Sequence, residues 1–365
     1  MAIVRCGSYS PAEVERAVRT CAELGDFRPR PGTKVLVKPN MLVPADPRSA
    51  ITTHPEFVRA VIHLLKDCGA EVTVGDSPGF LGCRQVARLT GIADVCRRAG
   101  ARLASFNDPA ALRDAYGAVC TRFEVAREVL EADLVVSLPK LKTHGLMRLT
   151  CAVKNMLGCV PGLGKQRLHA LFQDPERFGA MLVDLCRAVR PAMTFVDAVT
   201  AMEGNGPRNG RPRFVGLVLG STDPYALDVV ASDLVGINPA SVPTVAAAHR
   251  AGLGPLSPAE TPRVGVDPSE VRVADFRQAP LRRMERGPSP LRSLIRDYLI
   301  PRPEISAEKC RACLVCGRVC PAGAIGARGD RVRVDYSACI RCYCCDEVCP
   351  HGAIQLKVPL YRMFR

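Results

Sequence analysis

Cysteines repeat with a fixed spacing near the C-terminal end of the chain. A Cys-x2-Cys-x2-Cys-x3-Cys-Pro series begins at Cys310 and begins again 29 residues later at Cys339. Gly-Ala-Ile follows each series, which indicates a duplicated unit. In this pattern three thiolates bind one four-iron cluster, and the fourth, before proline, binds the other cluster of the pair. The spacing therefore predicts two [4Fe–4S] clusters and one-electron chemistry.

The pattern assigns four ligands to each cluster. The first cluster is assigned Cys310, Cys313, Cys316 and Cys349. The second cluster is assigned Cys339, Cys342, Cys345 and Cys320. Cys344 falls outside the spacing, so we expect it not to bind iron. Zinc is the alternative metal, but a zinc ribbon uses pairs of Cys-x2-Cys rather than two triplets that each have a distal Cys-Pro.

The remaining cysteines are scattered. Nine of the 18 cysteines lie upstream of residue 300, and no export signal favours disulfides. On helix-like stretches we expect them to pack as small apolar residues, as at Cys21, Cys68, Cys96 and Cys186. Two others, Cys151 and Cys159, stand in the most distinctive segment of the chain. There an extra ligand or a redox thiol is the alternative to packing.

Basic side chains gather between residues 139 and 169. Four lysines and two histidines occur in 31 residues, next to a Val/Leu-rich run. Lysines in a desolvated pocket bind carboxylate or phosphate groups, and a histidine acts as an acid near neutral pH. A solvated basic face is the alternative. We assign the catalytic roles to Lys140, Lys142, His144 and Lys154.

Alternating apolar segments place these groups on a fold. Strands are expected near residues 3–5, 34–38, 71–74, 133–137, 194–196 and 215–219. Helices are expected over residues 11–24, 54–68, 145–157, 175–189 and 225–235. The helix at residue 54 carries a Thr53-x-x-Glu56 capping box. This alternation predicts an α/β domain whose mainly parallel sheet has helices on both faces.

In such sheets ligands bind beyond the carboxyl ends of the strands. Polar residues follow several expected strands, as at 38–40, 75–79, 139–144 and Asp197. From these segments and the basic stretch we predict a substrate site formed by Lys38, Asn40, His54, Asp76, Ser77, Asn155, Lys165 and His169. The glycines of residues 158–165 do not form a nucleotide loop, because no Ser or Thr follows Lys165 and no strand precedes them.

Composition and length define the organisation of the chain. At 365 residues it fits an α/β domain over 1–277, an Arg/Pro-rich linker over 278–304, a small α+β ferredoxin-like domain over 305–356 and a tail over 357–365. No apolar run approaches the ~20 residues that cross a bilayer, and we see no secretory signal. These features predict a cytoplasmic protein without a membrane partner.

The formal net charge is +14, and about +10 once eight thiolates and two cluster cores are counted. Aromatic residues are only 5% and the arginines are spread along the chain, so we do not expect nucleic acid. An anionic small-molecule substrate or an acidic partner protein accounts for the positive charge equally well.

Several segments together resemble a known family. They are residues 34–40 (KVLVKPN), 53–56 (THPE), 75–79 (GDSPG), 139–144 (PKLKTH), 154–155 (KN) and the Asp223-Pro…Asp228 segment. In this order they resemble the domain of unknown function 362, and members of that family often carry a C-terminal two-cluster ferredoxin. The C-terminal unit itself is similar to bacterial two-cluster ferredoxins. The resemblance implies an iron–sulfur protein that transfers single electrons at low potential, and it leaves the reaction open.

These patterns favour an iron–sulfur oxidoreductase. We expect a reductase in which electrons pass from a redox partner protein through the clusters to an anionic substrate in the α/β domain. The alternative is a non-catalytic electron carrier, or a metalloenzyme maturation factor, whose α/β domain docks a partner. A third possibility is a ligase or transferase with structural clusters.

The ligand assignment has a direct chemical test. Protein purified without oxygen is expected to contain about eight iron atoms and eight acid-labile sulfides per chain. Cys344→Ser leaves this content unchanged, whereas Cys349→Ser loses one cluster. Iron and sulfide analysis measures both results. A full complement in the Cys349 variant contradicts the assignment.

Overall fold

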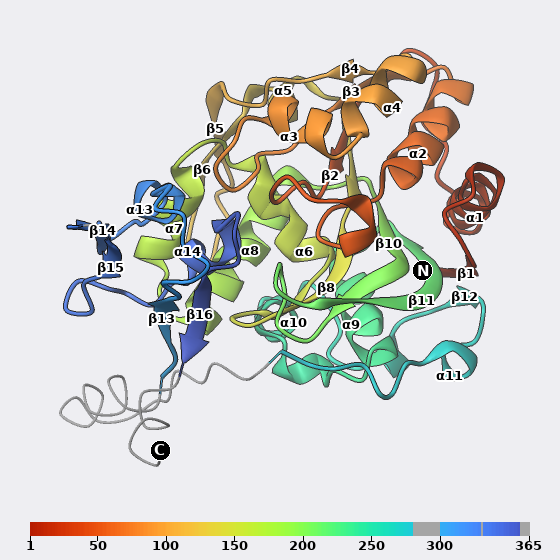
Figure 1. Ribbon diagram of the computed structural model, residues 1–365. Helices are drawn as coiled ribbons and strands as arrows, with labels where there is room; N and C mark the ends of the chain where they lie inside the picture. Colours follow the sequence, from red (N-terminus) through yellow and green to blue (C-terminus); the bar gives the residue numbers. More distant parts are fainter. Residues whose placement is uncertain (280–299, 330, 358–365) are drawn as a thin grey trace.

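The computed structural model describes residues 1–279, 300–329 and 331–357 (Figure 1). Most of the N-terminal part folds around one ten-stranded sheet. Its main path runs in the order β12 (Val264–Gly265), β1 (Ala2–Arg5), β11 (Arg211–Ser221), β10 (Met193–Glu203), β7 (Leu134–Leu138), β2 (Lys34–Pro39), β3 (Glu71–Val74) and β4 (Arg102–Leu103). Beside this path, β8 (Lys140–His144) pairs with β10, and β9 (Arg148–Thr150) pairs with β8.

The sheet is mainly parallel. Strands β7, β2, β3 and β4 are parallel neighbours, and β10 is parallel to both β7 and β8. Only β11 and β9 pair antiparallel to their neighbours in this sheet, within the described residues. The central strand β2 has buried residues from Val35 to Pro39, as expected for a strand covered on both faces.

Helices cover both faces of the sheet. They are α1 (Pro11–Leu24), α2 (Pro55–Asp67), α3 (Cys83–Leu89), α4 (Ile92–Arg98), α5 (Arg127–Glu131), α6 (Ala152–Asn155), α7 (Gly164–Leu171), α8 (Pro175–Val189), α9 (Pro224–Leu234), α10 (Pro243–Arg250) and α11 (Pro268–Val271). Successive residues of β11 show the two layers. Val218 belongs to the hydrophobic cluster that includes α1, whereas Leu217 and Leu219 belong to the cluster that includes α9. The predicted α/β fold class is confirmed.

Short elements complete this part of the chain. A separate antiparallel hairpin is formed by β5 (Pro109–Arg113) and β6 (Arg122–Ala126). Four 3₁₀ turns are described: η1 (Pro47–Ser49), η2 (Met156–Cys159), η3 (Pro239–Ser241) and η4 (Pro258–Glu260). No helix in the described part of the chain is both long enough and apolar enough to span a bilayer.

The predicted helix over residues 145–157 is wrong. The segment forms β9, α6 and η2 instead. Arg148 adopts φ 63°, which no α-helix allows, and Thr150 pairs with Lys142 of β8. Pairing with the neighbouring strand overrides the local preference for helix.

Two strands also extend beyond their predicted ends. Residues 140–144 form β8 rather than a loop, and Asp197 lies inside β10, opposite Lys140. The predicted Thr53 capping box is also wrong. The ring of His54 accepts the hydrogen bond from Glu56 N, whereas the Thr53 hydroxyl donates to Leu138 O at 2.6 Å.

The C-terminal unit is small and rich in cysteine. It contains two antiparallel strand pairs, β13 (Arg302–Ile305) with β16 (Ile354–Lys357) and β14 (Ile325–Arg328) with β15 (Arg331–Val334). Two short helices, α13 (Val315–Arg318) and α14 (Cys344–Val348), each contain the third cysteine of a triplet. Most of the predicted Arg/Pro-rich linker, residues 280–299, lies outside the described residues.

Helix α14 packs against the α/β domain (Figure 1). Phe80 packs on the apolar cluster that contains Val348, and Asn209 Nδ2 donates to Asp346 Oδ1 at 3.0 Å. At Gly79, an added Cβ would come within 2.9 Å of Val348 Cγ1 and 3.2 Å of Leu42 O. The two units therefore meet where the loop after β3 lies.

This close approach predicts a specific effect of Gly79→Ala. The added methyl group overpacks the contact with Val348, and such changes cost about 1–3 kcal/mol. We expect faster hydrogen exchange in α14 without loss of the α/β core. Gly82→Ala is the matched control, because an added Cβ there has no neighbour within 4 Å. Equal exchange rates in α14 for the two variants would contradict this docking contact.

Candidate functional site

A buried ion pair lies at the end of β2. Lys38 Nζ is 2.7 Å from Asp76 Oδ1, and the two side chains are 0% and 2% exposed. Met41 N donates to the second oxygen of Asp76 at 2.7 Å. The backbone of Gly158 lies against this pair, since a Cβ there would be 2.0 Å from Asp76 Oδ1. This close approach requires glycine, and it explains one glycine of the segment that resembled a nucleotide loop.

Two asparagines link this ion pair to β8. Asn155 Oδ1 accepts from Lys38 Nζ and from Asn40 Nδ2, both at 3.3 Å. Asn40 Oδ1 in turn accepts from Lys142 Nζ at 2.7 Å, and Ile51 O accepts from the same ammonium at 2.8 Å. Burial, followed by the charge of Lys154, lowers the pKa of Lys142 to about 7.

A second buried ion pair joins β8 to β10. Lys140 Nζ lies 2.8 Å from Asp197 Oδ2 and donates to Tyr9 Oη at 2.7 Å. The Tyr9 hydroxyl donates to Asp197 Oδ1 at 2.7 Å, and its ring stacks on His54 at 3.7 Å. Burial lowers the pKa of Lys140 against the opposing charge of Asp197. Because Asp197 balances the charge of Lys140, this lysine is suited to hold β8 and β10 in position rather than to bind an anion.

The segment that carries Lys154 and Asn155 is held by a buried carboxylate. Asp228 of α9 accepts hydrogen bonds from Ala152 N at 2.7 Å and Val153 N at 3.2 Å. Burial raises the pKa of Asp228 to about 7, although these hydrogen bonds oppose the shift. The carboxylate thereby fixes α6, which is too short to be stable by itself.

These elements surround a small cavity of about 80 Å³ between the two units. Its walls are formed by Asn40, Leu42, Asp76, Ser77, Gly79, Thr150, Lys154, Asn155, Leu157, Gly158, Lys165, Gln166, His169, Cys344, Glu347 and Val348. Polar groups come mainly from the α/β domain, whereas α14 closes the cavity with the last three residues. We refer to this space as the junction cavity.

Two lysines and two carboxylates line the cavity, and one of the carboxylates, Asp76, is paired with Lys38 behind the wall. Lys154 has no hydrogen bond or ion pair to any residue that the structure describes, and burial lowers its pKa against the charge of Glu347. Lys165 Nζ donates to Ser77 Oγ at 2.5 Å, Ser77 O at 3.0 Å and Val160 O at 3.2 Å. Burial lowers the pKa of Lys165 to about 8. An anion in the cavity would compensate these ammonium groups.

Glu347 supplies the carboxylate on the opposite wall. Its Oε1 is 3.0 Å from His144 Nε2. Nδ1 of His144 accepts from Leu146 N and Met147 N, so the ring carries its proton on Nε2 toward Glu347. Burial opposes ionisation of Glu347, but the hydrogen bond from His144 and the charge of Lys154 outweigh it and hold the pKa well below its usual value.

Two neutral groups also line the junction cavity. The Thr150 hydroxyl is buried with no hydrogen-bond partner in the described protein. His169 stacks on Phe178 with ring centroids 4.3 Å apart. Burial lowers the pKa of His169 to about 4, so its ring is neutral at pH 7. Both groups are therefore available to hydrogen-bond a ligand without adding charge.

The first predicted set of cysteine ligands surrounds one cavity of the C-terminal unit. Cys310, Cys313, Cys316 and Cys349 all line one small space. Burial and the nearby Cys349, Cys313 and Cys310 raise the pKa of the Cys316 thiol to about 11. No single-ion position in the described residues is surrounded by three or more His, Cys, Asp or Glu side chains. Four thiolates around a larger iron–sulfur core fit this arrangement.

The second predicted set lies next to the junction cavity. Burial raises the pKa of Cys339, and the neighbouring Cys342 and Cys320 act in the same direction. Burial likewise raises the pKa of Cys345 well above its usual value, as do Cys342, Cys339 and Cys316. Cys344 lines the cavity and is bonded along the chain to Cys345. Val348 also lines the cavity and is bonded along the chain to Cys349 of the first set, so both sets reach the cavity wall through α14.

The structure brings most of the predicted site residues together. The junction cavity is lined by Asn40, Asp76, Ser77, Lys154, Asn155, Lys165 and His169. Lys38 and Lys142 lie directly behind its wall, and His144 reaches it through Glu347. Lys140 and His54 lie apart, around Asp197. Cys151 and Cys159 are buried in the two hydrophobic clusters, as are Cys21, Cys96 and Cys186, whereas Cys68 is partly exposed.

Sequence reasoning missed the two side chains that α14 contributes to the cavity chemistry. Glu347 and Cys344 lie among the cluster ligands, where their surroundings suggest only the ferredoxin-like unit. Tyr9 was also missed, because a single tyrosine before a helix carries no motif. No local pattern shows that α14 docks on the strand ends.

The fold and the cysteine sets define an iron–sulfur protein with an α/β domain. Comparison with known families identifies this α/β domain. The chain belongs to the domain of unknown function 362 family, whose sequence profile matches residues 35–233. A 4Fe-4S dicluster domain profile matches residues 302–350. Both parts of the predicted resemblance are therefore confirmed, and so is iron–sulfur binding.

Two individual proteins are similar to the chain. Thylakoid-associated protein sll1697 of Synechocystis sp. is 37% identical over 262 residues, which cover 70% of this chain and 81% of that protein. The lactate racemase apoprotein of Thermoanaerobacterium thermosaccharolyticum has a TM-score of 0.41 at 11% identity. That similarity covers 60% of this chain and 53% of the racemase chain.

The lowered lysine pKa values predict how anion binding depends on pH. Lys142 and Lys165 have pKa values of about 7 and about 8, so both lose their charge as the pH rises through this range. We expect sulfate, whose own charge is constant here, to raise the Tm more at about pH 6.5 than at about pH 9.

The matched variants are Lys165→Met and Lys66→Met, the second on an exposed part of α2. Chloride at equal ionic strength gives the baseline for each thermal scan. Lys165→Met is expected to reduce the difference between the two pH values, and Lys66→Met to retain it. A sulfate effect that grows with pH would contradict an anion site at these lysines.

Proposed function

We propose that the protein is an iron–sulfur reductase whose substrate is a small organic anion bound in the junction cavity. In this proposal the chain carries two [4Fe–4S] clusters, held by the ligand sets given above. The observation that carries the proposal is the composition of the cavity walls. Lys154 and Lys165 lie on one side, and Cys344, the neighbour of a cluster ligand, lies on the other.

The lysines would bind the anionic group of the substrate. Lys154 is the main candidate, because its ammonium has no protein partner among the described residues. Lys142 and Lys38 lie behind the wall and are already bonded to Asn40 and Asp76. Their role is to hold the polar wall in place and to add positive potential. Thr150 and Asn155 offer further hydrogen bonds at the cavity surface.

A proton would reach the substrate through Ser77. Lys165 Nζ donates to Ser77 Oγ, which leaves the hydroxyl proton of Ser77 free to point into the cavity. With a pKa of about 8, Lys165 is mostly protonated at pH 7 and still gives up a proton readily. This relay replaces His144 as the direct acid, because the Nε2 proton of His144 is directed to Glu347.

The clusters supply one electron each. Reduction of a polarised double bond consumes two electrons and two protons, one proton from the Lys165–Ser77 relay and one from solvent. A low-potential one-electron carrier protein would then reduce the two clusters again, with one electron for each cluster. Apolar residues Leu42, Leu157 and Val348 line the rest of the cavity and would accommodate the carbon skeleton of the substrate.

Substitution of the cavity lysines separates a reductase from a carrier. Lys154→Met and Lys165→Met are expected to retain iron and to accept electrons from dithionite at the wild-type rate. Loss of a charge-assisted contact costs a few kcal/mol, so turnover should fall by roughly 100-fold or more. Turnover is measured by incubating the reduced protein with cell extract and following the metabolites that disappear.

Lys66→Met is again the control, since this lysine is exposed on α2. Lys140→Ala is a poor test, because it leaves Asp197 buried without its cation and destabilises the fold by about 3–5 kcal/mol. If both cavity variants match the wild type in extract-dependent turnover, the junction cavity is not a substrate site. The α/β domain would then be a docking module for a partner.

A further inference from the structure

The two cysteine sets differ in their access to solvent. In the first set Cys313 is exposed and Cys310 is partly exposed. Its other two members, Cys316 and Cys349, are buried, whereas the second set has two buried and two partly exposed members and no exposed one. The first set, through Cys313, is therefore the one that an external electron carrier can approach most closely.

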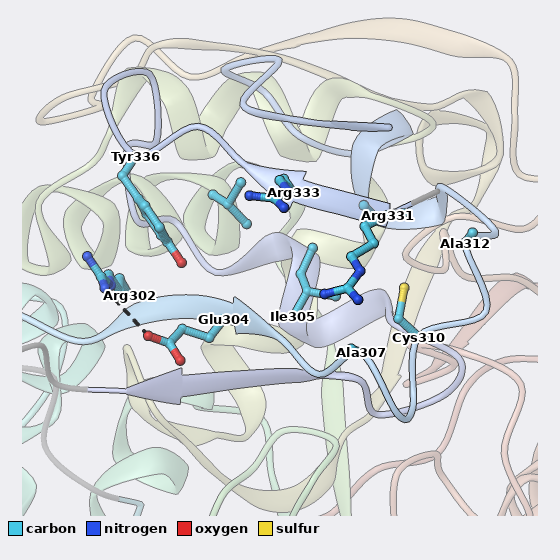
Figure 2. A pocket seen from close by; sticks show the side chains of 11 residues that line it. Arg302, Glu304, Ile305, Ala307, Cys310, Ala312, Arg331, Arg333 and Tyr336 are labelled. Carbon is cyan, nitrogen blue, oxygen red and sulfur yellow. Dashed lines mark ion pairs between the residues drawn. The ribbon is translucent and has the colours of Figure 1, made fainter. Parts of the chain in front are cut away.

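A groove of about 570 Å³ reaches this exposed set (Figure 2). Its lining includes Cys310 together with the three arginines Arg302, Arg331 and Arg333. We call it the arginine groove. It lies between the β13 strand and the β14–β15 hairpin, and Figure 1 shows this hairpin on the side of the C-terminal unit that faces away from the α/β domain.

The groove is strongly positive. Arg331 and Arg333 are exposed on β15, and Figure 2 shows both in the wall of the groove, with Arg331 near Cys310. Glu304 is the one carboxylate among the lining residues that the structure describes. Arg302 at 3.6 Å and Lys357 at 3.4 Å neutralise it. Among the described lining residues, three arginines thus outnumber one carboxylate.

The other lining residues suit contact with a protein. Arg302 lies over the ring of Tyr336 at 4.4 Å, and this ring is 37% exposed. Ile305, Val332 and Val334 form an apolar floor between the charged side chains. Aromatic and arginine side chains around a small apolar centre are typical of protein–protein interfaces.

We propose that the arginine groove is the docking site of an acidic one-electron carrier protein, which delivers electrons to the first cluster. The occupant follows from charge complementarity, since a surface rich in arginine binds and steers a partner rich in Asp and Glu. The direction of electron flow follows from the point of entry, which is the first set, because Cys313 is its exposed ligand and Cys310 lines the groove. Only this direction rests on the function proposed above.

The test uses the cluster-loaded full chain and a reduced acidic flavodoxin as the probe. The rate at which the clusters lose visible absorbance is measured by stopped flow at several ionic strengths. Electrostatic steering changes association rates by about 10–10³-fold. We therefore expect the double variant Arg331→Glu/Arg333→Glu to be reduced at least about 10-fold more slowly at low salt, with the difference shrinking as salt rises.

Arg28→Glu/Arg30→Glu is the matched control. These two arginines are exposed, have the same spacing, and change the net charge of the chain by the same amount. We expect this variant to react within about twofold of the wild type. Dithionite reduction and iron content should be the same for all three proteins. The single variant Arg333→Glu is expected to have an intermediate rate. This result would show that the slower reduction of the double variant is not caused by misfolding.

Three results would overturn the proposal. The first is a wild-type rate for the groove variant, and the second is an equal loss in the control variant, which would reflect overall charge. The third is binding of single-stranded DNA that the groove variant abolishes while flavodoxin reduction is unchanged. No substrate enters this assay, so its outcome is independent of the junction cavity, and failure of the cavity variants would leave the docking result intact.

Discussion

The buried ammonium groups at the carboxyl end of β2 and along β8 are the constraint on which the rest of the site depends. A buried lysine is stable only when hydrogen bonds or a carboxylate replace its water. Lys38 has Asp76, Lys140 has Asp197, and Lys142 has two neutral oxygens. Each of these partners comes from a different part of the chain, so the polar wall assembles only when the sheet is complete. Gly158 contributes by the absence of a side chain, which lets the backbone lie against the Lys38–Asp76 pair.

The C-terminal unit completes this electrostatic balance. Lys154 faces the junction cavity without a protein partner in the described residues, and the nearest acidic group is Glu347 of α14. Glu347 stays ionised because His144 donates to it from β8. One hydrogen bond thus joins the strand-end wall to the cysteine unit. Close packing of Val348 at Gly79, beside Leu42, also holds α14 against the α/β domain.

The sequence predicted the parts of this arrangement that depend on local pattern. The cysteine spacing predicted the first ligand set, whose members line one cavity, and strand–helix alternation predicted the fold class. The basic segment was correctly singled out for its unusual composition, but its conformation was not predicted. Pairing of Thr150 with Lys142 turns a helical pattern into a strand, and this pairing is non-local. Asp197 was placed at a strand end because the bulge that lets β10 continue past Ala198 has no sequence signal.

The position of the junction cavity suggests why the two units are joined in one chain. A cavity whose walls come from both units exists only while α14 is docked, so an anion bound to Lys154 and the cluster ligands are held close together. Cys344 lines the cavity and adjoins Cys345 of the second set, and Val348, which also lines it, adjoins Cys349 of the first set. Both sets therefore reach the cavity wall along α14, and Cys310 of the first set also lines the arginine groove. The first set thus connects the two spaces, because one of its ligands lies in the groove wall and another follows a residue of the cavity wall.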